Sequence, residues 1–174
     1  MNSQCDASTL TWLGRREITR AKGRDFGTIP GEACGFIVVK AADQMGGMVL
    51  SAAHVEWSEV DSQASAAALC RALEATLQPE TLPKVVMLDT AGLPGQAESW
   101  AMASMRTLGR RGVAPRLLEP GLSLGDIGAA TLPVYLGLLS HDLAGDTLVT
   151  ISGGLQGNRG ALLVEPGVPR EAAT

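Results

Sequence analysis

The sequence predicts one layered α/β domain with a mixed five-stranded sheet and helices on both faces. Short β-branched apolar runs alternate with longer segments that space their apolar residues as a helix does, and no repeat or linker divides the chain. The 174 residues suit a single domain, and 45% apolar residues are enough for a hydrophobic core. We expect the domain to span residues 1–166 and residues 167–174 to form a flexible tail.

Six runs have the composition of strands. Residues 35–40 are compact and β-branched, as expected of a buried strand. Residues 48–60 form a longer candidate, and residues 84–89 end on a carboxylate. The remaining runs lie at residues 115–119, 147–152 and 160–164, and a glycine-rich turn joins the last two.

Four segments are predicted to be helical. Ser8 caps a short amphipathic helix that ends near Ile18, and residues 63–77 and 95–108 form two longer helices. Residues 126–143 are apolar on nearly all sides. Because a helix with one face in water needs an apolar stripe of only ~100°, we expect a second sheet or another subunit over the outer face of this helix.

Charge and hydropathy limit the partners of the chain. The net charge is −4 and the pI is ≈ 5.2, which excludes nucleic-acid binding through a broad basic surface. The longest apolar run, residues 127–140, is shorter than the ~20 residues that a bilayer requires. The first ten residues carry neither the basic segment nor the apolar core of a signal peptide. We therefore expect no nucleic-acid or membrane partner and a cytoplasmic location.

The three cysteines are far apart in the sequence. Their odd number and wide spacing fit neither a disulfide framework nor a zinc site, and we expect no metal and no cofactor. Cys34 is expected to be a buried, inert thiol at the entry to a strand, and Cys70 to belong to the core. Cys5 lies near the terminus without a predicted base.

Several polar groups have two interpretations. His54 and Glu56 share one face of a strand, either as an acid/base pair or as a solvated pair. His141 and Asp142 end the apolar helix, where a histidine suits the helix dipole. Residues 153–160 are a phosphate cradle or, since a strand follows rather than a helix, a tight hairpin. A local basic cluster forms a solvated face or contacts an acidic partner: Arg106, Arg110, Arg111 and Arg116.

Three segments together carry a family resemblance. Residues 29–39 read Ile-Pro-Gly-Glu-Ala-Cys-Gly-Phe-Ile-Val-Val, residues 125–130 read Gly-Asp-Ile-Gly-Ala-Ala, and residues 151–164 have the form of a closing hairpin. In order and spacing, from about Cys5 to Glu165, the chain resembles the carboxy-terminal half of β-ketoacyl synthases of the thiolase superfamily, with their PGEGAA and GHxxGAAG elements. The resemblance implies a thiolase-like half-domain in which the helix at 126–143 packs between two sheets.

The chain departs from this family at its catalytic positions. The family's nucleophilic cysteine belongs to the amino-terminal half, which this chain lacks. The first family histidine falls where this sequence ends a strand at Asp89, and the second falls on Gly125 or Asp126. Glu98 matches an acidic residue early in the helix after the first histidine. Because a carboxylate repels a developing oxyanion, the resemblance implies degenerate positions, no catalytic residues and no enzyme activity of the chain alone.

Three functions are compatible with these observations. The first is a non-catalytic, ketosynthase-like protein that acts through protein contacts, as a homodimer or an adaptor for an acyl carrier or secretion-related protein. In that case Leu136→Arg should disrupt the assembly. The second is the carboxy-terminal piece of a split ketosynthase-like protein, completed by a separate amino-terminal chain. The third is a small acyl-ligand-binding domain or enzyme that uses Asp89, Glu98 and Asp126 at the strand ends.

Overall fold

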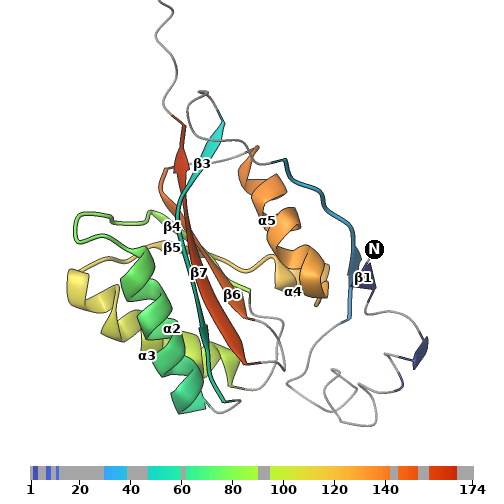
Figure 1. Cartoon of the computed structure of the whole chain (residues 1–174), viewed down its shortest axis with the longest axis horizontal. Coiled ribbons are helices and arrows are strands. Elements are labelled where there is room, and N and C mark those ends of the chain that lie inside the picture. The colour runs from blue at the N-terminus through green and yellow to red at the C-terminus, as the bar shows by residue number, and fades with distance from the viewer. Residues whose placement is uncertain are drawn as a thin grey trace, which may run out of the picture.

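The computed structural model describes residues 2–3, 7–8, 11, 30–38, 47–59, 62–89, 95–141, 145–152 and 157–167. A mixed five-stranded sheet lies at its centre (Figure 1), which confirms the predicted sheet. Strand β7 is antiparallel to both of its neighbours, β3 and β6, whereas β4 is parallel to both of its neighbours, β6 and β5. In sheet order the strands are β3 (Met48–Trp57), β7 (Asn158–Pro166), β6 (Thr147–Ser152), β4 (Val85–Met87) and β5 (Arg116–Leu118).

Helices cover both faces of the sheet, as predicted (Figure 1). Helices α2 (Ser62–Thr76) and α3 (Gln96–Arg106) pack on one face, and α5 (Thr131–Leu139) packs on the other. Because side chains alternate along a strand, Val86 of β4 joins the core under α2 and α3, whereas Met87 joins the core under α5. Short elements complete the fold: η1 (Gly109–Arg111), α4 (Gly121–Leu124) and η2 (Gly128–Ala130).

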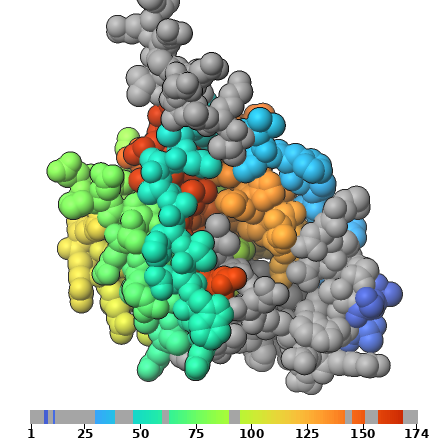
Figure 2. Space-filling model, in the orientation of Figure 1, coloured from blue at the N-terminus to red at the C-terminus, as the bar shows by residue number. Residues whose placement is uncertain are grey.

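The predicted strand at residues 35–40 is wrong. Residues 34–38 form no strand, and Phe36 and Val38 are 91% and 90% exposed; residues 39–40 lie outside the described part. Just before this segment, the short strand β2 (Glu32–Ala33) pairs with β1 (Asn2–Ser3) in a separate two-stranded sheet. The segment lies across the outer side of α5, with Gly35 against Pro133, because the five places in the sheet belong to other strands (Figure 2).

The apolar helix begins later than predicted. Asp126 precedes a 3-10 turn, and the α-helix itself starts at Thr131 and ends at Leu139. The physical cause is Gly125 and Gly128, whose positive φ angles of 74° and 58° interrupt helical geometry. Segment 30–38 covers part of the outer side of α5, so Pro133 is half-buried. The area of α5 left for the expected second sheet or subunit to cover is therefore smaller than predicted.

The remaining predictions concern the other helices, the glycine-rich stretch and the tail. Of the helix expected from Ser8 to Ile18, residues 8 and 11 are helical and the rest lies outside the described residues, as do residues 153–156 and the tail from 168. The helices at 63–77 and 95–108 are confirmed as α2 and α3. In the described part of the chain, no helix has the length and apolar character needed to cross a bilayer.

Candidate functional site

The end of strand β4 places Asp89 near two buried side chains from other elements. Asp89 follows Leu88, is half-buried, and donates its backbone N–H to Thr150 Oγ1 at 3.4 Å. Its negative charge acts on the hydroxyl of Tyr135 and on the guanidinium of Arg159. The resemblance leads to Asp89, but the sequence gives no sign of these two partners, because they come from α5 and β7.

Tyr135 is the buried centre of this region. Its hydroxyl donates a hydrogen bond to the carbonyl oxygen of Leu88 at 3.2 Å and accepts one from the N–H of Gly121 at 3.1 Å. Burial strongly raises the pKa of Tyr135, and the charges of Asp89, Glu119 and Asp126 raise it further. A phenol held neutral and fully engaged with backbone groups connects elements and is unsuited to act as a proton donor.

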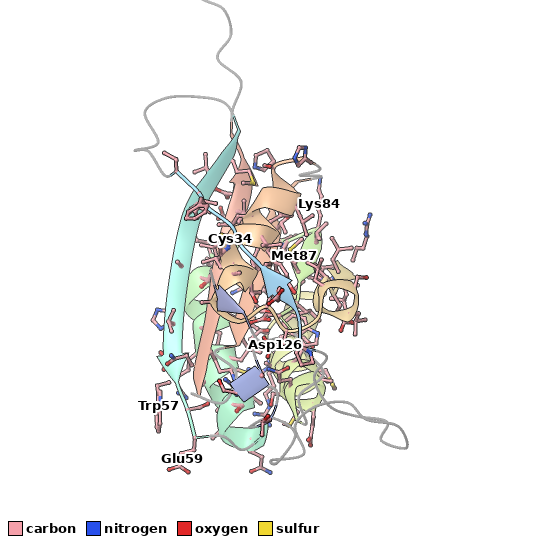
Figure 3. All side chains as sticks on the ribbon, turned by 90° about the vertical axis from the view of Figure 1, so that its right-hand side faces the viewer. Cys34, Trp57, Glu59, Lys84, Met87 and Asp126 are labelled. Carbon is pink, nitrogen blue, oxygen red and sulfur yellow. The ribbon has the colours of Figure 1, made fainter. Side chains whose placement is uncertain are left out.

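Asp126 is used to build the turn before α5. Its Oδ1 accepts the N–H of Gly128 at 2.9 Å, and its backbone carbonyl accepts the N–H of Gly31 at 2.9 Å. Asp126, labelled in Figure 3, also forms a parallel β-bridge with Pro30. Gly125 is buried with a φ of 74°, a conformation that favours glycine. Asp126 therefore attaches segment 30–38 to the start of the α5 layer.

Glu98 lies apart from this group. It is exposed in the first turn of α3, where its charge suits the helix dipole. The carboxylates that act most strongly on Tyr135 are Asp89, Glu119 and Asp126, so the structure groups two of the three acids proposed from the sequence and adds Glu119. Within the described ranges, no three His, Cys, Asp or Glu side chains are arranged to hold a metal ion.

Arg159, a member of the proposed phosphate cradle, is instead a buried connector. It is 5% exposed, and it donates from Nη2 to Ser65 Oγ at 3.0 Å and from Nη1 to the carbonyl of Asn158 at 2.7 Å. Burial lowers the pKa of Arg159, and the charge of Asp89 opposes this effect. The antiparallel pairing of β6 with β7 agrees with the hairpin interpretation. The guanidinium thus attaches β7 to the first turn of α2.

His54 and Glu56 do form a pair on one face of β3. His54 Nε2 lies 2.8 Å from Glu56 Oε1, and Arg71 Nε donates to Glu56 Oε2 at 3.1 Å. Hydrogen bonds first from His54 and then from Arg71 lower the pKa of Glu56. Because an ionised carboxylate of lowered pKa is a weak base, this geometry favours the solvated pair. His141, the other histidine, is exposed just beyond α5.

The cysteine and arginine predictions are partly corrected. Cys34 is exposed, not buried, because its segment is not a strand. Cys70 packs against the core, and burial raises the pKa of its thiol. Arg111 donates to the carbonyls of Gln78 and Leu77 at 2.6 and 3.0 Å and so caps the end of α2. The other members of the basic cluster are exposed: Arg106, Arg110 and Arg116.

Exposed apolar side chains gather on the side of the sheet that α5 covers. We call this the α5-side surface; it comprises Phe36, Ile37, Val38, Leu122, Leu124 and Leu138. Figure 1 places α4, α5 and segment 30–38 together on this side. Leu136, the test position chosen from the sequence, is 2% exposed and belongs to the core, whereas Leu138 is 47% exposed. An all-round apolar sequence does not reveal which of the two points outward.

A hollow of about 320 Å³ opens on the same side, between α5 and the end of β5. Met87, Leu118, Leu138 and Leu139 give it apolar walls, and Glu119 and Pro120 border it. It lies at the carboxyl ends of parallel strands, where α/β sheets bind their ligands. This hollow and the α5-side surface both offer an apolar contact.

Among known proteins, the chain has structural neighbours but no match in sequence. No protein-family model matches the chain, and no curated protein sequence matches it. Among solved structures, it resembles a complex of a type II PKS acyl-carrier protein with its ketosynthase bound to the hexaketide, with 14% identity and a TM-score of 0.47. The match covers 67% of this chain, which spans about a third (32%) of that one. A TM-score below 0.5 assigns no function to this chain.

Proposed function

We propose that the chain is a non-catalytic, ketosynthase-like protein that acts through protein contacts at its α5-side surface, by self-association or as an adaptor. One observation carries the proposal: Phe36 and Val38, the apolar residues of the predicted strand, are about nine-tenths exposed (91% and 90%). Burying a side chain of this size contributes about 1.5–3 kcal/mol, and apolar side chains gathered at one exposed site mark contact surfaces. A partner therefore gains free energy by covering the α5-side surface.

The chemistry of the family positions supports the non-catalytic part of the proposal. Asp126 engages Gly128 and Gly31 in the turn, and Gly125 has no side chain. Asp89 and Asp126 both place negative charge near the Tyr135 hydroxyl. An oxyanion developing here would meet repulsion instead of the donors that stabilise it. These groups favour a structural use of the positions that the resemblance connects with catalysis.

A separate ketosynthase-like chain is the second candidate partner. The same exposed apolar surface favours it, because an amino-terminal half supplied by another protein would cover that surface equally well. The two candidates differ in the purified state of the chain. Self-association predicts a homodimer without any added protein, and the split arrangement predicts a monomer that binds the second chain.

The experiment compares Phe36→Ser/Val38→Ser with the native chain by sedimentation velocity. Since neither side chain is buried in the monomer, we expect the double variant to keep its fold, checked by circular dichroism, and to lose the native assembly. Met105→Ser is the matched control, because Met105 is 73% exposed on α3, on the opposite side of the sheet. An assembly that persists in the double variant, or that Met105→Ser also removes, would contradict the proposal.

A further inference from the structure

We propose that two copies of this chain pair face to face through the α5-side surface, with Phe36 of each copy seated in the hollow of the other. This inference rests on the proposed function and specifies its partner as a second copy. Phe36, which we call the knob, and the hollow lie on the same molecule. A two-fold dimer uses the same surface twice, so each copy must carry both halves of the contact.

The hollow has the size and character to accept an aromatic ring. An apolar cavity of about 150 Å³ holds benzene, and this hollow measures about 320 Å³. Met87 and Leu139 are buried and form its floor, while Leu138 is half-exposed and forms part of its wall. Phe36 is an aromatic side chain on this surface and is 91% exposed. An aromatic side chain in an apolar pocket is the usual anchor of a protein interface.

The positions of the two features suit a two-fold axis. Figure 3 looks onto the α5 layer: the segment with Cys34 crosses over α5 toward β3, whereas Met87 lies toward the other edge of the sheet. The knob and the hollow thus flank α5. An axis that runs along α5 in the plane of the interface places the β3 side of one copy against the β5 side of the other. Both knobs then meet both hollows at once.

The apolar area available is enough for a dimer of ordinary size. The six residues of the α5-side surface have exposed fractions from 41% to 91%. At roughly 100 Å² for a fully exposed apolar side chain, they offer on the order of 400 Å² per copy. Since interfaces are about 60% apolar, this corresponds to roughly 650 Å² per partner. That value lies within the range of about 600–1,000 Å² per partner for stable interfaces.

Cross-linking between two different chains tests this pairing. The first chain carries Cys5→Ser and Cys70→Ala, so that Cys34, which is exposed two residues before Phe36, is its single thiol. The second carries Cys5→Ser, Cys34→Ser, Cys70→Ala and Leu138→Cys, which places its thiol at the hollow. The chains are mixed and treated with a short bis-maleimide. The control replaces Leu138→Cys with Met105→Cys on the opposite side of the sheet.

We expect the Leu138→Cys chain to link to Cys34 at least tenfold more than the Met105→Cys chain does. Adding Phe36→Ala to both chains should remove this difference. Light scattering of the same mixture separates the two proposals. A dimer without preferential linking at Leu138 would overturn the pairing but not the proposed contact function. A monomer under all conditions would overturn the pairing and the self-association on which it rests, leaving the adaptor role to be tested with other proteins.

Discussion

The Tyr135 hydroxyl lies 3.2 Å from the carbonyl oxygen of Leu88 and donates a hydrogen bond to it. Because the same hydroxyl accepts the Gly121 N–H, one side chain connects the end of β4, the start of α4 and the middle of α5. Of these elements, β4 and α5 line the hollow, and α4 and α5 carry part of the α5-side surface. The shape of the contact surface therefore depends on a buried phenol that must remain neutral.

The first prediction concerns alkaline pH. Burial, and then the charge of Asp89, raise the pKa of Tyr135 above the ordinary value of 10.0. Above pH 10 the unfolded chain releases this proton and the folded chain keeps it, so the free energy of unfolding should fall as pH rises above 10. Tyr135 is the single tyrosine of the chain, so phenolate absorbance follows it directly. Ionisation at the ordinary pH in the folded protein would contradict the prediction.

Tyr135→Phe provides the control for this titration. At neutral pH the variant leaves the Gly121 N–H and the Leu88 carbonyl without the hydroxyl, and should lose about 1–3 kcal/mol in a urea titration. The free energy of unfolding of the variant should then fall less above pH 10 than that of the native chain. Ser123→Ala, exposed on α4, should change the free energy of unfolding by no more than about 0.5 kcal/mol.

The second prediction concerns the attachment of segment 30–38. A Cβ at Gly31 would clash with the backbone oxygen of Leu124 and approach Ile127, so Gly31→Ala should break the Gly31–Asp126 hydrogen bond. We expect a loss of about 1–3 kcal/mol and faster proteolysis of this segment. Gly137→Ala is the matched control: its Cβ meets no atom within 4 Å, and within α5 it should stabilise by about 0.5–1 kcal/mol. Equal melting temperatures for the two variants would contradict the attachment.

The third prediction concerns Arg159. Arg159→Met keeps much of the side-chain volume but removes the donor to Ser65 and the positive charge near Asp89. The variant should lose about 1–3 kcal/mol, measured by chemical denaturation. Arg110→Met, at an exposed position, should change stability by no more than about 0.5 kcal/mol. An unchanged free energy of unfolding in Arg159→Met would mean that this arginine does not connect β7 to α2.

The fourth prediction concerns acidic pH. Hydrogen bonds from His54 and Arg71 lower the pKa of Glu56 below 4.5, so its contribution to stability is present above that pH and is lost as pH falls through the folded-state pKa. The free energy of unfolding of Glu56→Gln should therefore fall less than that of the native chain when the pH is lowered from 5. Glu74→Gln, at an exposed position on α2, serves as the comparison. Identical acid profiles for Glu56→Gln and the native chain would contradict this role.

The sequence predicts the sheet and its helices because each has a distinct period. Apolar spacing places α2 and α3 correctly, and short apolar runs place β4 and β5. The strand prediction at residues 35–40 fails because an apolar composition indicates burial but does not show which part of the protein, or of a partner, covers the residues. In the structure its apolar residues lie outside α5, and Phe36 is exposed. An interface and a buried strand have the same composition.

The site was only partly predictable for a related reason. Asp89 and Asp126 could be named from the resemblance, but their shared neighbour Tyr135 lies in an apolar helix, where it reads as core. Arg159 stands in a glycine-rich stretch, and its contact with Ser65 joins residues 94 positions apart. Such contacts depend on which strands are neighbours in the sheet. Periodicity along the chain does not contain that information.

The most direct test of the central claim is the mass of the purified chain by light scattering after size-exclusion chromatography, measured over a range of concentrations. One chain has a mass of 18.0 kDa. We predict a species of twice that mass, which returns to the mass of one chain in Phe36→Ser/Val38→Ser. A native chain that remains at 18.0 kDa at every concentration would contradict self-association through the α5-side surface.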